Sequence, residues 1–179
     1  MPPPSSWSVQ VEAGGDCVVA AAVPDGYEQP GWLITGRFSG SVAFGAFRFF
    51  PALDRGSALA PSAFAAHLTS AGDFAWVVQV ECEVESAVAG KVECDGGKIV
   101  PDGAGGALVS GSIWGTARFG DSIHQLGSID FFNMMTAAPS DDVREWQQWA
   151  RLKDQAQAAF VMRVSSTGNI KWARHVPSY

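Results

Sequence analysis

The feature of this 179-residue sequence that most constrains its fold is a segment that occurs twice. The run AFAAHLTSAGDFAWVVQV, from Ala63 to Val80, returns as AFVMRVSSTGNIKWARHV, from Ala159 to Val176, at a constant offset of 96 positions. In each copy, alternating apolar residues lead into a turn with Gly and Asx residues, and an aromatic opens the next apolar run. Each copy therefore predicts a β-hairpin. Repeats of this kind constrain the architecture more than any single residue does.

Two further matches extend the repeat. Leu33–Gly45 matches Leu108–Gly120 at an offset of 75, and Trp7–Glu12 echoes Trp76–Glu81 at an offset of 69. Because 96 exceeds 75 by 21, the second copy must carry about 21 additional residues between its two matched segments. The sequence therefore predicts one outer strand followed by two full repeats, over 7–80 and 81–179.

Apolar alternation and turn residues place the remaining elements. Residues 1–6 form a Pro/Ser arm that we expect to be extended. Phe47–Pro61 is expected as a loop, and the glycines of Cys94–Lys98 and Pro101–Gly106 predict turns. The strands expected outside the duplicated hairpins are Trp7–Val11, Asp16–Val23, Leu33–Phe38 with a short continuation over Gly40–Phe44, Val84–Val92 and Leu108–Ile113.

The second repeat contains the only helix that the sequence predicts, over about residues 130–157. Ser140 or Asp141 caps its N-terminus, and Val143, Trp146 and Trp149 follow a spacing of three to four residues. Two roles stay open for this apolar stripe. Either it packs onto its own repeat or plugs an open end, or it docks a partner, where aromatic anchors contribute most.

Charge argues against two classes of partner. The chain has a net charge of −6 and a pI near 4.9, whereas a nucleic-acid or anionic-membrane surface needs a basic patch. No apolar run approaches the roughly 18 residues of a membrane span, and the start MPPPSSW lacks the layout of a signal peptide. We therefore expect a soluble chain with no nucleic-acid partner and no membrane insertion, in a compartment that composition leaves open.

The three cysteines form no regular framework. Cys17, Cys82 and Cys94 are odd in number and irregularly spaced. We interpret them as buried thiols that act as small apolar residues. A Cys82–Cys94 disulfide would require those two segments to lie side by side, so the redox state of all three stays open.

No residue pattern predicts catalysis or a cofactor. His67, His124 and His175 do not lie at metal-ligand spacing from one another or from a cysteine. Asp95–Gly97 and Asp102–Gly103 lack the alternating acidic ligands of a calcium loop and are interpreted as turns. There is no G-x-S-x-G nucleophile motif. We therefore expect no catalytic, metal-binding or cofactor-binding residues, and a protein that is not an enzyme.

The repeat pattern resembles a known family, the β-propeller repeats of bacterial and some algal proteins (SBBP-like repeats). The residues that carry the resemblance are Thr35-Gly36, Phe38, Gly40-Ser41-Val42, Phe44-Gly45, Ala63-Phe64, Leu68, Gly72 and Trp76, with Ser110-Gly111, Gly115-Thr116-Ala117, Phe119-Gly120, Ala159-Phe160-Val161, Gly168-Asn169 and Trp172 in the second copy. The resemblance implies that each repeat is a propeller-like blade. Together with the outer strand and the helical insertion inferred above, we expect an all-β fold of two four-stranded antiparallel propeller-like blades, with an extra N-terminal outer strand and one helical insertion. The resemblance also implies a secreted or cell-surface protein. Ser62 and Ala158 stand where the family usually has an acidic residue, so the role of that acid is not carried over.

Two blades do not close a propeller, which needs four to eight. Three outcomes follow: the protomers assemble, the chain is part of a larger propeller, or the two blades pack as an open sandwich. Unpaired outer edges at Trp7–Val11 and Trp172–Val176 favour self-association or contact with a protein partner.

The leading hypothesis is a non-enzymatic structural scaffold or protein–protein interaction subunit of a larger assembly. Its candidate partner-binding residues are Trp146, Trp149, Val143, Trp114 and Trp32. The tryptophans at equivalent repeat positions, Trp7, Trp76 and Trp172, are expected to be structural. The alternative is a carbohydrate-binding, lectin-like module that uses exposed tryptophans to stack on a glycan.

Overall fold

The computed structural model describes residues 10–26, 31–50, 61–83, 93–114, 116–119, 122–124 and 157–177. Within these ranges the chain is all-β, and every strand pairing is antiparallel. The all-β prediction is therefore confirmed for this part of the chain. No helix able to cross a membrane occurs in the same ranges.

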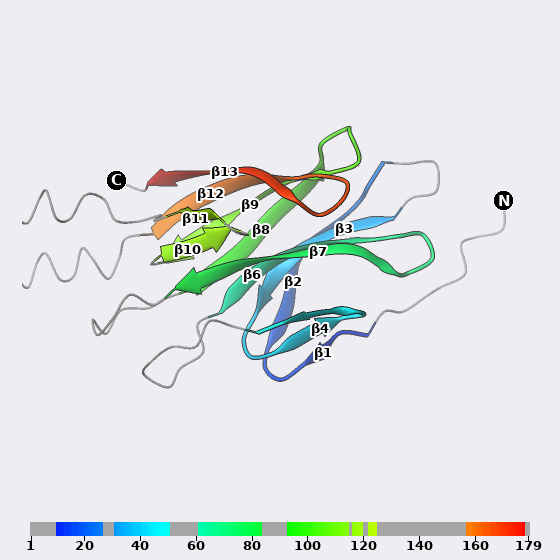
Figure 1. Cartoon of the computed structure of the whole chain (residues 1–179), viewed down its shortest axis with the longest axis horizontal. Coiled ribbons are helices and arrows are strands. Elements are labelled where there is room, and N and C mark those ends of the chain that lie inside the picture. The colour runs from blue at the N-terminus through cyan, green and yellow to red at the C-terminus, as the bar shows by residue number, and fades with distance from the viewer. Residues whose placement is uncertain are drawn as a thin grey trace, which may run out of the picture.

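The strands form three sheets in layers (Figure 1). A six-stranded sheet in the middle has the order β11-β10-β7-β6-β3-β2, with the four-stranded sheet β13-β12-β9-β8 on one side and the three-stranded sheet β1-β4-β5 on the other. The bounds are β1 Glu12–Ala13, β2 Cys17–Pro24, β3 Trp32–Phe38, β4 Val42–Phe44, β5 Phe47–Phe49, β6 Ser62–Leu68, β7 Phe74–Glu83, β8 Glu93–Pro101, β9 Ala107–Trp114, β10 Thr116–Phe119, β11 Ser122–His124, β12 Gln157–Val164 and β13 Ile170–Pro177.

The duplication seen in the sequence is present in the strand register. Gly36 of β3 lies opposite Phe64 of β6, and Gly111 of β9 lies opposite Phe160 of β12. A β-bulge falls at the same place in both duplicated hairpins, and another falls at the same place in β2 and β8. We call β2, β3, β6 and β7 repeat 1, and β8, β9, β12 and β13 repeat 2. Each repeat is a four-stranded antiparallel meander.

In each repeat, a short hairpin between the second and third strands pairs with a strand that precedes the repeat in the chain. In repeat 2 the hairpin β10–β11 pairs with the end of β7, where Arg118 lies opposite Glu81. The equivalent hairpin β4–β5 pairs with β1 in the same way, and Ala43 lies opposite Glu12. Therefore β1 stands in the same relation to repeat 1 as β7 does to repeat 2, which explains why Trp7–Glu12 echoes Trp76–Glu81.

The main core lies between the two repeats. Its largest fully buried side chains include Trp76 from repeat 1 and Phe160 and Met162 from repeat 2, with Phe119 of β10 in edge contact with Phe160. A second core lies on the other face of the six-stranded sheet. There the rings of Phe44 and Phe64 stand 4.8 Å apart, and Phe38 packs beside them. Each face of the six-stranded sheet therefore carries a core, although parts of β2 and β3 stay exposed.

Three local predictions are wrong. The segment Gly40–Phe44 does not continue the strand before it, because β4 joins the three-stranded sheet. Phe47–Phe49 is strand β5 within the expected loop. Cys94–Lys98, expected as a turn, lies inside β8. Its glycines serve packing instead, because a Cβ on Gly96 would collide with Thr35 and with the backbone of Gly36 across the core.

Several expected elements lie outside the described residues. They are the arm 1–6, positions 7–9 of the first strand, the strand Val84–Val92 and the helical insertion up to residue 156. Val11 is described and is not part of a strand, and Gln157 is the first residue of β12.

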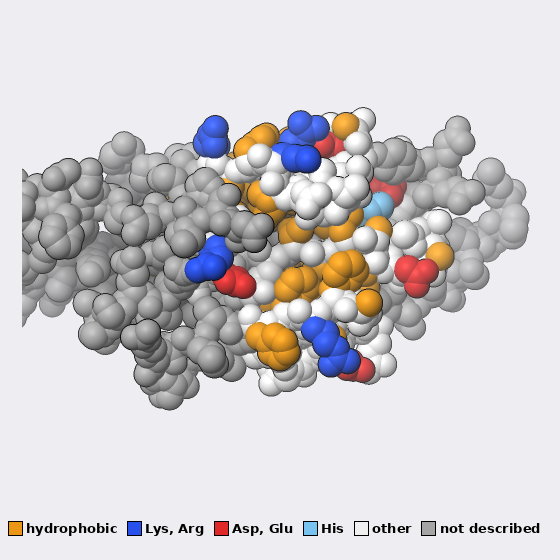
Figure 2. All heavy atoms as spheres, viewed as in Figure 1, with side chains coloured by type: hydrophobic (Ala, Val, Ile, Leu, Met, Phe, Trp, Pro, Cys, Tyr) orange, Lys and Arg blue, Asp and Glu red, His pale blue; other side chains and the backbone are white. Residues whose placement is uncertain are grey.

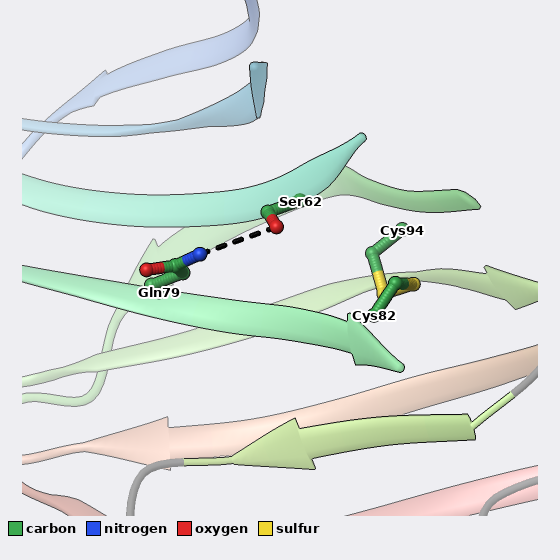
Figure 3. The surroundings of a disulfide bond; sticks show 4 residues. All are labelled: Ser62, Gln79, Cys82 and Cys94. Atoms are coloured by element: carbon green, nitrogen blue, oxygen red, sulfur yellow. Dashed lines mark hydrogen bonds between the residues drawn. A yellow bond between two sulfur atoms is a disulfide. The ribbon is translucent and has the colours of Figure 1, made fainter. Parts of the chain in front are cut away.

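A disulfide between Cys82 and Cys94 joins the end of β7 to the start of β8 (Figure 3). Both residues are fully buried, and 12 positions of sequence separate them. The interpretation of these two cysteines as free thiols is therefore wrong, and the alternative that their segments lie side by side holds. Cys17 is a free, partly buried cysteine, and burial raises the pKa of its thiol.

Candidate binding surfaces

The described ranges hold no group of three or more His, Cys, Asp or Glu side chains that could bind a metal ion. Some of the charged side chains in these ranges form small pairs that join one strand to another. Arg37 of β3 reaches across to Glu93 and Asp95 of β8 and ties the two repeats together beside the disulfide. These contacts are structural in character, because each charge is already engaged by another.

An aspartate closes the turn after the first strand of each repeat. In repeat 2, Asp102 accepts hydrogen bonds from the backbone N–H groups of Ala104 and Gly106, both at 2.8 Å, and from Nε of Arg163 at 2.9 Å. The Ala104 bond is the main cause that holds the pKa of Asp102 below the ordinary value, with help from Arg163 and Gly106 and against the effect of burial. This turn, predicted from Asp102-Gly103, is present, with Gly103 at a positive φ of 76°.

The equivalent turn in repeat 1 is closed by a histidine in place of the arginine. Oδ2 of the buried Asp25 accepts the N–H of Gly31 at 3.0 Å and lies 2.8 Å from Nε2 of His67. The His67 ring also packs against Trp76, with centroids 5.9 Å apart. His67 occupies the position equivalent to Arg163. In both repeats the turn aspartate therefore contacts a side chain from the third strand, histidine in repeat 1 and arginine in repeat 2.

One surface of repeat 1 is an apolar patch that we call the open face. It lies on the side of β2 and β3 that bears Phe38, and its exposed members are Val19, Ala22 and Trp32. Val19 is 54% exposed and Trp32 is 40% exposed. Their counterparts in repeat 2 are Gly96, Ile99 and Ala107, and all three are buried against repeat 1. Positions that form the core between repeats are therefore uncovered in repeat 1.

A second surface, which we call the outer face, is the side of repeat 2 that points away from the core. Its apolar members are Leu108, Val100, Val161 and Trp172, and its cations are Lys98, Arg163 and Arg174. Basic side chains gather at the upper margin of Figure 2, where Figure 1 shows β12 and β13. The outer face thus combines apolar and basic groups with two acids of β8, Glu93 and Asp95, which are paired with Arg37.

Among the described tryptophans, Trp172 is more exposed than the sequence predicts. Trp32 lies on the open face, as a candidate contact residue should, whereas Trp114 is partly buried at the end of β9. Trp172, expected to be structural, is 38% exposed, although its counterpart Trp76 is only 2% exposed. The remaining candidates Val143, Trp146 and Trp149 lie outside the described residues. Sequence reasoning missed Trp172 because its repeat position alone does not show whether another unit covers it.

Comparison of the chain with protein families, curated proteins and solved structures found no match.

Proposed function

We propose that this protein is a non-enzymatic repeat module that acts as a structural scaffold or protein-interaction subunit of a larger assembly. The charged clusters in the described ranges hold strands together, and this supports a structural role. We further propose that the two repeats are blade-like units in the sense of the β-propeller repeats that the sequence resembles. Two such units do not close a ring, and completing one would require further units or another copy of the chain.

The observation that carries this proposal is the difference in burial between the open face and its counterpart. The same three positions are buried in repeat 2 and exposed in repeat 1. An uncharged, exposed surface that is a packing surface elsewhere in the same chain favours protein contact.

The proposed occupant is a second copy of the chain, paired through β2. Among the described strands, β2 is the last in the six-stranded sheet, and two of its valines are exposed, one on each face: Val18 at 46% and Val19 at 54%. An antiparallel β2 strand from a second copy would cover both valines and would pair with the backbone edge that no described strand occupies. Two-fold pairing of identical edges is also the commonest symmetry of homo-oligomers.

Sedimentation velocity at micromolar concentration tests this proposal. The wild-type chain is expected to sediment as a dimer, and Val19→Lys is expected to shift it to the monomer because it places a charge at the paired edge. The matched control is Val100→Lys, which adds the same charge at a valine of similar exposure on the outer face. A monomeric wild-type chain, or equal effects of the two variants, would contradict pairing through β2.

A second candidate function, carbohydrate binding, is favoured by one observation. Trp172 presents an exposed ring on a sheet surface, directly opposite Arg163 of the neighbouring strand. Aromatic rings with polar neighbours suit ligands that have both apolar faces and hydroxyl groups.

A further inference from the structure

We infer that the outer face of repeat 2 binds an anionic polysaccharide, with Trp172 under a sugar ring and the surrounding cations on its acidic groups. This inference rests on the second candidate function and names the class of glycan. It concerns a surface different from the one proposed for self-association.

The outer face of repeat 2 can be compared, position by position, with the equivalent face of repeat 1. The face of repeat 1 that packs on repeat 2 has Ala21 and Val78 at the positions where the outer face has Lys98 and Arg174. Leucine and tryptophan are kept, as Leu108 and Trp172. Burial of two unpaired cations in a sheet-to-sheet core would be costly. The outer face is therefore unsuited to stacking a further repeat in the manner of repeat 1.

The charge of the outer face is opposite to that of the chain. The whole sequence carries −6, yet this face presents Lys98, Arg163 and Arg174. Asp102 pairs with Arg163, and the acids of the same face, Glu93 and Asp95, pair with Arg37. Lys98 and Arg174 therefore carry the excess positive charge of this face among the described residues. A local concentration of positive charge on an acidic protein attracts anions to that surface.

The arrangement of apolar and charged side chains on the outer face favours a hydrated polysaccharide over a protein as its ligand. Protein interfaces have an apolar centre from which charged residues are depleted. On the outer face, Trp172 stands directly opposite Arg163, and Val161 stands directly opposite Arg174. Leu108 also stands opposite Arg163, and only Val100 stands opposite another apolar residue, Leu108. Cations are therefore interspersed among most of the apolar side chains of the outer face.

The central strand of the outer face adds hydroxyl groups. Ser110 and Ser112 project from β9 between the flanking strands, and Ser110 stands opposite both Val161 and Lys98. The row from Arg174 to Lys98 crosses four strands, which at about 4.8 Å per interstrand step spans roughly 14 Å. An extended acidic oligosaccharide can meet Arg174, the Ser110 hydroxyl and Lys98 along this row, with Trp172 and Arg163 in the adjacent row.

Arg163 is held in place before any ligand arrives. Its Nε and Nη2 atoms both lie 2.9 Å from Oδ2 of Asp102, and its side chain is still 42% exposed. A side chain that is already ordered loses less conformational entropy on binding. Asp102 is thus a positioning residue for this surface.

The test is isothermal titration calorimetry of the full chain with an alginate hexasaccharide, whose sugars all carry carboxylates, and with a neutral cellohexaose. The alginate oligosaccharide is expected to bind and the neutral one to bind at least about tenfold more weakly. Affinity should fall as the ionic strength rises above about 0.15 M, where charges are screened beyond about 8 Å. Trp172→Ala should lower the affinity about tenfold or more, and Arg174→Ala should lower it a few-fold.

Trp32→Ala is the matched control, because Trp32 is as exposed as Trp172 but lies on the open face. It should leave alginate binding unchanged. Equal binding of both hexasaccharides would overturn the preference for anions and keep the carbohydrate-binding candidate, whereas binding of neither would overturn both. Binding of polyglutamate as tight as that of alginate would also overturn the inference, because charge alone would then explain it.

Discussion

The backbone of Gly36 in β3 lies so close to Gly96 of β8 across the main core that Gly96 has no room for a side chain. A Cβ on Gly96 would stand 2.7 Å from the carbonyl oxygen of Gly36 and 2.8 Å from its nitrogen. The contact joins the middle of repeat 1 to the first strand of repeat 2, so it sets how closely the two sheets approach. Val19 occupies the position equivalent to Gly96 in repeat 1, and there the side chain is exposed.

Gly96→Val should therefore destabilise the protein by forcing the sheets apart. We expect the free energy of unfolding to fall by about 1–3 kcal/mol, as for overpacked cores. Urea unfolding followed by circular dichroism measures this. Gly97→Ala is the control, because a Cβ there would lie 3.2 Å from the Ser110 carbonyl oxygen and needs only a small shift. Equal stability of Gly96→Val and wild type would show that the sheets do not approach as described.

Trp76 and Trp172 should respond differently to truncation, although they hold the same place in the repeat. Trp76 is buried in the main core, where Gly168 of the β12–β13 turn packs on it, so Trp76→Ala should cost about 3–5 kcal/mol of stability. Trp172→Ala should cost less than about 1 kcal/mol, since the ring is exposed. Thermal and urea unfolding of both variants compare them directly.

The variant Trp76→Phe tests whether the buried volume of Trp76 or its indole N–H contributes to stability. The Nε1 atom of Trp76 is buried without a hydrogen-bond partner among the described residues. Trp76→Phe should therefore retain more stability than Trp76→Ala, because it keeps most of the buried ring. Similar losses for Trp76→Ala and Trp172→Ala would contradict the difference in burial.

The repeat could be predicted from the sequence because identities such as Phe64 and Phe160 recur at one offset, and equivalent residues then adopt the same register. The packing role of Gly96 could not be predicted from the sequence. Gly96 looks like part of a turn, and only the arrival of Gly36 from 60 positions earlier makes it a packing residue. The exposure of Trp172 could not be predicted either, because it depends on whether another sheet packs on that face of β13 and not on the neighbouring sequence.

The Cys82–Cys94 disulfide should stabilise the junction between the repeats. A closed loop of about this length contributes roughly 3 kcal/mol by restricting the unfolded chain. The double variant Cys82→Ala with Cys94→Ala should lose about that amount, and reduction of the wild type should have a similar effect. Cys17→Ala is the control, because Cys17 is not in a disulfide. Thiol titration of the unfolded, unreduced protein should find one free thiol, and three would contradict the bridge.

Asp102 should make stability depend on pH in the acidic range. Its pKa is lowered in the folded protein, so it stabilises the fold above the ordinary aspartate pKa of about 3.9 and loses that effect as the pH falls through its depressed value. Asp102→Asn should therefore be less stable than wild type at pH 7, and the difference should shrink steadily below about pH 4. Urea unfolding at a series of pH values measures both chains, with Asp73→Asn in the exposed β6–β7 turn as the control. A difference between Asp102→Asn and wild type that stays constant down to about pH 2 would show that the bonds from Ala104, Gly106 and Arg163 do not favour the ionised carboxylate.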